Sequence, residues 1–517
     1  MRIIPNSPAA LALASLVFIA GAWAQTTTGK PNVLWIISDD LDMDVGCYGD
    51  KSARTPHIDA LAAQGVRFDR AYAQYTLCNP SRTSFLSGKR PDTTRIWDNE
   101  TEPRAFLGQD YVFLPEYFRA QGYYTGAAGK IAHFAGSLKW DSYLGTKGEK
   151  DTLVQPAQMI HSMAWQASGL PDSEMQDGKT ARRVGELMKV KRAKPFFLAA
   201  GFHKPHTPCV APKAYFDLHP LDKIILRPQR ADDLLDIPRP AFFLRESLLT
   251  EDQWRHVLQA RAAAVSFMDA QVGYLMHLLD SLDLRKNTVV VFQSDHGFLL
   301  GEHQGGCYKT TLFEPTARVP LIVSMPGKAK GKSSEGFVEL VDLYPTLADL
   351  CGLPPPPEME GTSFAPLLNA PAKAWKSAAF TQVYRVPHAD PFTPSEITVP
   401  FMAYAMRTDR YRFMDWQAFG REAYDEDRDP EEWDNLVFGS ANPRLSDSLA
   451  TMLQAGWKAA LPGKPVALRP EPGQRNTRID GGSRASFASG HWRYRLGPAR
   501  EIDLAGKVRS AQAQAPQ

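Results

Sequence analysis

Short uninterrupted runs of apolar residues recur along the N-terminal part of the chain, at residues 32–38, 195–200, 287–292 and 318–323. Runs of this length without polar alternation are typical of strands buried on both faces of a sheet. Segments with helical periodicity or helix start and stop signals lie between them, at residues 55–65, 115–122, 180–189, 254–282 and 339–350. Shorter strands are expected at residues 66–72 and 123–126. This alternation predicts an α/β fold with a mostly parallel, doubly wound sheet flanked by helices.

Charged and imidazole side chains follow directly after several of these predicted strands. They are Asp39, Asp40, Lys130, His203, Asp295 and His296. In doubly wound sheets, ligands bind beyond the carboxyl ends of the strands. We therefore expect these side chains to meet at one edge of the sheet and to form a site there.

The pattern changes after the proline run at residues 354–357, and a boundary is expected near residues 371–376. Beyond it, residues 404–414 and the region of Tyr424 are expected to form antiparallel strands, followed by a helix at residues 446–460. The chain therefore divides into a leader (1–24), a catalytic domain (25–375), a smaller α+β subdomain with an antiparallel sheet (376–462) and an irregular tail (463–517). Residues 491–494 could add a strand within the tail, and the proline-rich excursion at residues 208–240 is expected to line a site.

The N-terminus has the features of a secretory signal. Arg2 precedes an apolar run at residues 9–22, and Ala22-Trp23-Ala24 offers a cleavage site after Ala24. The alternative, a membrane anchor, ranks lower because the run is shorter than the roughly 20 residues that a spanning helix needs. We expect an exported, periplasmic or secreted protein without stable membrane insertion. The net charge of +2 gives no reason to expect nucleic acid as a partner.

The stretch Cys78-Asn79-Pro80-Ser81-Arg82 is the strongest candidate for chemistry. Pro80 suits the first position of a helix, and the serines and threonine around it favour a helix start. Such a helix would direct its free N–H groups and positive dipole end at the Cys78 side chain, and Arg82 would add a fixed positive charge. The segment therefore predicts an anion site. A cysteine considered alone is more often a small buried thiol.

A metal site is the second prediction. Asp39 and Asp40 alone could form a turn or cap a helix, but Asp295 and His296 add a carboxylate and an imidazole at a neighbouring strand end. A divalent cation would balance this concentration of negative charge. Oxygen ligands favour Ca²⁺, with bonds of about 2.3–2.6 Å. Mg²⁺ or Mn²⁺ is the alternative, because one imidazole slightly weakens the case for Ca²⁺.

The motif Cys-x-Pro-Ser-Arg at Cys78 resembles the signature of the type I sulfatases of the alkaline phosphatase superfamily, in which the cysteine is oxidised to formylglycine. The similarity extends over about residues 31–460 and includes residues 32–50, 88–95, 197–206, 294–303 and 424–436. It is strongest to the iduronate-2-sulfatase group. The resemblance implies an alkaline-phosphatase-like fold, hydrolysis of a sulfate ester, and a formylglycine-generating enzyme as a partner during maturation.

The resemblance also implies a role for each matching residue. The metal ligands would be Asp39, Asp40, Asp295, His296 and the modified Cys78. Arg82 would hold the hydrated aldehyde, and Lys130 and Lys309 would bind sulfate oxygens. His203 would protonate the leaving alcohol with Lys309 beside it, and His133 would take the proton that releases sulfate. A covalent sulfo-enzyme would divide one difficult displacement into two easier steps.

Together these features predict an exported sulfuric ester hydrolase that acts on a sulfated carbohydrate. The resemblance suggests a 2-O-sulfated uronic acid within a polysaccharide, although fold and subgroup do not fix a substrate. Two alternatives remain open: a phosphonate or phosphodiester hydrolase with the same nucleophile, and a catalytically inactive carbohydrate-binding relative. Lys204, His206 and His303 could bind substrate or only shape their loops.

Overall fold

The structure is a computed structural model that describes residues 29–145, 158–160, 163–190, 193–241, 249–387, 397–464, 495–496 and 500–501. The predicted leader (1–24) and the predicted strand at residues 491–494 lie outside the described residues. Within the described ranges, no helix combines the length and the apolar character needed to cross a bilayer.

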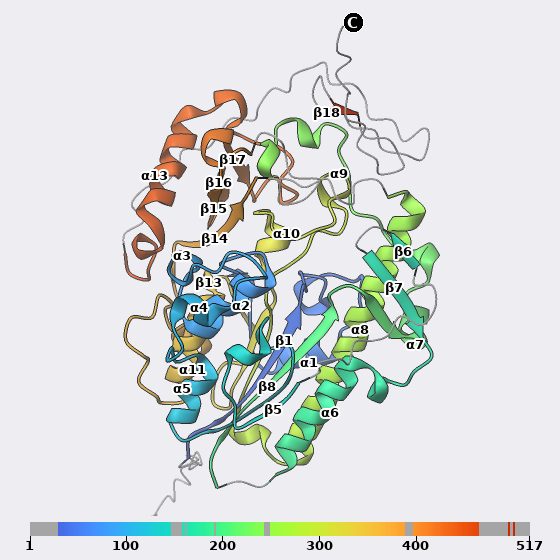
Figure 1. Cartoon of the computed structure of the whole chain (residues 1–517), viewed down its shortest axis with the longest axis vertical. Coiled ribbons are helices and arrows are strands. Elements are labelled where there is room, and N and C mark those ends of the chain that lie inside the picture. Colours follow the sequence, from blue (N-terminus) through green and yellow to red (C-terminus); the bar gives the residue numbers. More distant parts are fainter. Residues whose placement is uncertain are drawn as a thin grey trace, which may run out of the picture.

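An eight-stranded sheet forms the centre of the larger unit, in the order β12-β2-β11-β10-β1-β8-β4-β5 (Figure 1). The strands are β12 (Lys332–Ser334), β2 (Val66–Phe68), β11 (Leu321–Ser324), β10 (Thr288–Ser294), β1 (Asn32–Asp39), β8 (Phe196–Pro205), β4 (Tyr124–Gly129) and β5 (Ser142–Leu144). β1 pairs in parallel with β10 and β8, whereas β11 is antiparallel to β10 and β2. The sheet is thus mostly parallel, as predicted.

Helices cover both faces of this sheet (Figure 1). Val33, Trp35 and Ile37 of β1 share one apolar layer with α2, α5, α11 and α12, whereas Leu34 and Ile36 share the opposite layer with α1, α6 and α8. These helices are α1 (Pro56–Ala63), α2 (Cys78–Ser87), α5 (Leu114–Ala120), α6 (Gln176–Lys189), α8 (Glu251–Ser281), α11 (Leu343–Leu350) and α12 (Ala365–Asn369). Because both layers are apolar, β1 needs apolar residues at successive positions, which explains its uninterrupted run.

The observed elements differ from the predicted ones in three places. The strand predicted at residues 66–72 is two strands, β2 and β3 (Ala71–Tyr72), separated by a turn. β8 does not end at residue 200 but continues to Pro205. The excursion at residues 208–240 contains regular structure, since β9 (Cys209–Pro212) pairs with β7 (Met163–Ser168), and β7 pairs with β6 (Gln158–Ile160).

A four-stranded antiparallel sheet and a long helix form the C-terminal part. They are β14 (Ala378–Arg385), β15 (Phe401–Thr408), β16 (Tyr411–Asp415), β17 (Arg421–Asp425) and α13 (Pro443–Ala459). The sequence did not reveal β14, because most of its side chains are buried and polar and apolar positions do not alternate along it. The short elements α3 (Pro91–Thr94), α4 (Pro103–Leu107), α7 (Lys213–Asp217), α9 (Glu302–Gly305), α10 (Glu314–Ala317) and β13 (Val338–Glu339) complete the larger unit. The exact domain boundaries stay predictions.

Candidate active site and metal centre

The carboxyl end of β1 carries the first two acidic residues of the site. Asp39 ends the strand, and Asp40 follows with a φ of 66°, in the left-handed region. The Asp40 N–H donates to the Asp295 carboxylate at 3.1 Å, and the Arg261 guanidinium donates to the Asp40 carbonyl. These contacts hold Asp40 in a conformation that residues other than glycine rarely adopt. The carboxylates of two successive residues therefore reach one centre.

Cys78 is the first residue of α2, and all ten residues of this helix are buried. The helix begins two residues earlier than predicted, so Pro80 occupies its third position rather than its first. Proline is tolerated there because the first N–H groups of a helix have no intrahelical partner. The Cys78 side chain stands at the N-terminal end of the helix, where the dipole favours an anion.

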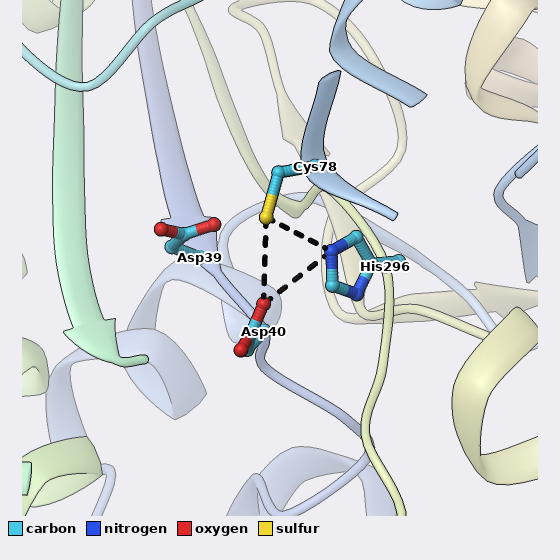
Figure 2. A group of neighbouring side chains, drawn as sticks. All are labelled: Asp39, Asp40, Cys78 and His296. Carbon is cyan, nitrogen blue, oxygen red and sulfur yellow. Dashed lines mark hydrogen bonds and ion pairs between the residues drawn. The ribbon is translucent and has the colours of Figure 1, made fainter. Parts of the chain in front are cut away.

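Four predicted metal ligands meet at this point. Figure 2 shows Asp39, Asp40, Cys78 and His296, whose ligand atoms all lie within 4.8 Å of one another. The Cys78 sulfur is 3.8 Å from Asp40 Oδ1 and 3.4 Å from His296 Nε2. His296 Nδ1 donates to the Gly297 carbonyl at 2.8 Å, which leaves Nε2 to face the centre. Two carboxylates and an imidazole with its free nitrogen turned inward fit a divalent cation.

Asp295, the fifth predicted ligand, lies beside this group. Its Oδ1 accepts the backbone N–H groups of Asp40 at 3.1 Å and His296 at 3.0 Å, and its Oδ2 accepts from Arg82 at 2.8 Å. The Asp295 carboxylate thus orients two of the other ligands. Whether it also coordinates the ion stays a prediction.

Arg82 is the main counter-charge of the site. Its guanidinium is completely buried and contacts Asp39 at 3.1 Å as well as Asp295. It also donates to the carbonyls of Lys130 at 2.5 Å and Ile131 at 3.0 Å. Arg82 therefore links the carboxyl ends of β1, β10 and β4 next to Cys78.

Two lysines complete the positive side of the centre. The Lys130 ammonium lies 2.5 Å from Asp39 Oδ2, and the Lys309 ammonium lies 2.8 Å from Asp40 Oδ1 and 3.2 Å from the Cys78 sulfur. Burial raises the pKa of Asp39, but Lys130 helps to hold that pKa well below its usual range. Burial by itself raises the pKa of the Cys78 thiol. Neighbouring positive charges, Lys130 and Lys309 among them, outweigh burial, so the pKa lies well below its usual value. The centre thus favours an anion at position 78.

His206 is a site residue that the sequence left undecided. Its Nε2 lies 3.8 Å from Asp40 Oδ2, and its Nδ1 lies 2.6 Å from the Thr207 carbonyl oxygen. Burial lowers the pKa of His206, but Asp40 outweighs burial and raises it above the ordinary value. A second imidazole therefore lies beside Asp40 at the edge of the predicted metal centre.

His203, the predicted proton donor, has different surroundings. Its Nε2 lies 3.4 Å from the side-chain nitrogen of Gln176. Burial lowers the pKa of His203, and Lys130 lowers it further, to about 3. His203 is therefore neutral at physiological pH, and its predicted role as an acid stays untested.

The remaining candidate residues are His133, Lys204 and His303. His133 keeps a buried Nδ1 with no hydrogen-bond partner among the described residues, and its role stays a prediction. The Lys204 ammonium donates to the Pro208 carbonyl at 3.0 Å, and His303 pairs with Asp233 at 3.0 Å. These last contacts show Lys204 and His303 shaping loops.

None of the five cysteines, all of which lie within the described residues, forms a disulfide bond. Cys47 is partly exposed, whereas Cys78, Cys209, Cys307 and Cys351 are buried. Cys78 is therefore not part of a disulfide bond.

Comparison with known proteins gives a consistent result. A model of the family described as "Sulfatase" matches residues 31–353, and one described as "N-sulphoglucosamine sulphohydrolase, C-terminal" matches residues 301–458. Iduronate 2-sulfatase of Mus musculus is 32% identical over 83% of this chain and 95% of that protein. Iduronate 2-sulfatase of Homo sapiens is 32% identical over 80% of this chain and 90% of that protein.

Solved structures share the fold. A phosphonate monoester hydrolase of Agrobacterium radiobacter superposes with a TM-score of 0.70 at 20% identity, over 82% of this chain and 95% of that one. A 2-O GAG sulfatase superposes with a TM-score of 0.64 at 25% identity, over 82% of this chain and 91% of that one. The first likeness concerns the fold alone.

Proposed function

We propose, from the premise that this chain belongs to the sulfatase family, that it is an exported enzyme that removes sulfate from a 2-O-sulfated uronic acid in a polysaccharide. The observation that carries the proposal is the convergence of Asp39, Asp40, Cys78 and His296 within 4.8 Å, with Lys309 against the Cys78 sulfur. Every residue that the proposed mechanism requires is present in the chain.

The family implies formylglycine at position 78 and a bound divalent ion, and the residues present fit both. Residue 78 is buried at a helix start among cations, where the hydrated aldehyde would supply an oxygen nucleophile and the ion would polarise the sulfate. Asp39, Asp40 and His296 would hold the ion, with Ca²⁺ proposed because the donors are mainly oxygen. The formylglycine-generating enzyme would be the maturation partner.

The positive side chains support a sulfate position next to residue 78. Lys130 and Lys309 flank residue 78 from the sides of Asp39 and Asp40, so both ammonium groups can contact sulfate oxygens while Arg82 fixes the carboxylates beneath. Charge that develops in the transition state is thus met by groups already in place.

As an alternative to the predicted acid His203, we propose His206 for proton transfer to the leaving alcohol. The His206 Nε2 lies 3.8 Å from Asp40 Oδ2, and Asp40 raises the pKa of this imidazole more than burial lowers it. The pKa of His203 is lowered to about 3 by burial and Lys130, so it carries no proton to give at neutral pH. His133 is retained as the base that assists release of sulfate.

The substrate proposal rests on the relatives. Two iduronate 2-sulfatases match at 32% identity over most of their length, and a 2-O GAG sulfatase shares the fold at 25% identity. These names support a sulfate at position 2 of a uronic acid. Export rests on the leader at residues 1–24.

The test uses protein from its native host. Mass spectrometry of the peptide that contains Cys78 should show formylglycine, and a panel of sulfated oligosaccharides should lose sulfate from position 2 of the uronic acid. An unmodified thiol would favour the inactive carbohydrate-binding relative. Faster hydrolysis of an aryl phosphodiester than of an aryl sulfate would favour the phosphodiesterase.

A further inference from the structure

The segment at residues 309–313 joins the catalytic centre to the C-terminal sheet. At its start, the Lys309 ammonium lies 3.2 Å from the Cys78 sulfur. At its end, Leu312 and Phe313 are completely buried in one apolar cluster with side chains of β14, β15, β16 and β17. Figure 1 shows this sheet next to α10, which continues the segment. One end of the segment therefore reaches the nucleophile position, and the other end packs on the C-terminal sheet.

The backbone has an uncommon conformation directly after Lys309. Thr310 has a φ of 63°, in the left-handed region that β-branched residues rarely adopt. Its N–H donates to the Thr76 carbonyl at 2.9 Å, and Thr76 Oγ1 donates to the Thr311 carbonyl at 2.8 Å. Thr76 itself lies two residues before Cys78. Because Thr310 sets the course of the backbone on either side of it, a group that holds Thr310 also holds the backbone of Lys309.

A buried arginine of β14 holds the same turn through its carbonyl. Arg385 is 2% exposed, and its guanidinium donates to the Thr310 carbonyl at 2.7 Å and to the Pro240 carbonyl at 2.8 Å. The guanidinium also lies over the Trp416 ring, 5.0 Å from its centroid. Burial of a guanidinium is costly unless polar groups or an aromatic face replace water, and these contacts do so. Arg385 therefore fixes the Thr310 carbonyl relative to the C-terminal sheet.

A second arginine of the sheet contacts the end of the segment, but its surroundings are different. Arg412 Nη1 donates to the Leu312 carbonyl at 2.9 Å, and Arg412 Nε lies 2.8 Å from Glu432 Oε1. Arg412 also pairs with Glu314. Its removal would disturb a buried ion cluster as well as the segment. Replacement of Arg385 is therefore the more direct way to release the turn after Lys309.

We propose that Arg385 is a positioning residue that holds the Thr310 carbonyl and thereby keeps the Lys309 ammonium against residue 78, so that the C-terminal sheet takes part in catalysis. The inference rests on the proposed function, in which Lys309 binds a sulfate oxygen. A lysine carries its charge on a flexible four-carbon stem, so its ammonium keeps one position only if its backbone is fixed. A displacement of about 1 Å from the productive geometry can cost roughly 100-fold in rate.

The test measures kcat/KM for 4-nitrophenyl sulfate, whose good leaving group keeps turnover measurable in weak variants, and for a disaccharide that carries a 2-O-sulfated uronic acid. Arg385→Met should lower both values at least about tenfold. The double variant should lose no more than Lys309→Met alone, because Arg385 acts through Lys309. Arg410→Met is the matched control, since Arg410 pairs with Asp425 within the same sheet at 2.5 Å, and it should keep the wild-type kcat/KM.

Arg385→Lys keeps the buried charge but offers a single donor group in place of the planar fork. Its kcat/KM should lie at least about threefold below wild type and should recover part of the loss seen in Arg385→Met. It also replaces Arg385→Met in the comparison with Lys309→Met if the methionine variant does not fold. An unchanged kcat/KM in Arg385→Lys when Arg385→Met does not fold would leave Arg385 a purely structural role and overturn the inference.

Two other results bear on the inference. Unchanged kcat/KM in Arg385→Met, or losses in the double variant that multiply those of the single variants, would overturn it while wild-type activity upholds the proposed function. Wild-type protein that hydrolyses neither substrate would overturn the proposed function together with this inference.

Discussion

Replacement of Arg82 by leucine tests whether the site is held together by its buried charges. The guanidinium has no exposed surface, and it contacts Asp39 at 3.1 Å and Asp295 at 2.8 Å, both equally buried. Arg82→Leu keeps an apolar side chain in the same space but removes the cation bonded to Asp295 and leaves Asp39 with Lys130 alone. Breaking a buried pair on one side costs about 3–5 kcal/mol, because the remaining charge stays desolvated.

The assay is thermal unfolding in EDTA, so that no bound cation can compensate. At roughly 2 °C per kcal/mol for a domain of more than 200 residues, the midpoint should fall by about 6–10 °C. Arg285→Leu is the matched control, because its partner Asp280 is more than half exposed and such pairs contribute about 0–1 kcal/mol.

The loss of stability caused by Arg82→Leu should also depend on pH. Burial raises the pKa of Asp295 to about 6 even though Arg82 lowers it, so removal of Arg82 raises the pKa further. A carboxyl with a raised pKa in the folded state binds its proton more tightly than in the unfolded chain, and stability falls as pH rises through that range. The Arg82→Leu penalty should therefore be larger at pH 8 than at pH 5. A midpoint for Arg82→Leu that is less than about 2 °C below that of wild type, roughly 1 kcal/mol by the same scaling, would refute this reasoning. So would a difference between the two midpoints that does not change with pH.

Three further outcomes follow from the geometry. Cys78→Ala should abolish hydrolysis of 4-nitrophenyl sulfate with an unchanged unfolding midpoint, and turnover by this variant would exclude residue 78 as the nucleophile. His206→Asn should slow phenyl sulfate about 100-fold more than 4-nitrophenyl sulfate, since acid catalysis matters most for poor leaving groups; equal slowing would argue against the acid role. Burial raises the pKa of Glu339, but Arg90 and Lys376 outweigh it and lower the pKa to about 2. The interaction of Glu339 with Arg90 and Lys376 stabilises the fold above the unfolded pKa of about 4.3 and is lost as pH falls toward 2. The difference in unfolding midpoint between wild type and Lys376→Met should therefore narrow between pH 5 and pH 3.

The sequence by itself determined the sheet and most of the site. Uninterrupted apolar runs marked β1, β8 and β10, because a strand with helices on both faces needs apolar side chains in both directions. Parallel strands end at one edge of a sheet, so the sequence placed Asp39 and His296 at the same edge. The direct pairing of β1 with β10 then makes them neighbours.

The tertiary structure decided which groups face the nucleophile. Between Ile37 and Asp39, the pairing of β1 with β8 slips, so that Ile37 lies opposite Gly201 and Asp39 opposite Pro205. Such an irregularity re-aims side chains, so counting along the strand cannot tell which imidazole points inward. The structure turns His206 toward Asp40 and leaves His203 against α6. The contact of Asp177 with His203 spans 26 residues and depends on how α6 packs against β8, which no local pattern encodes.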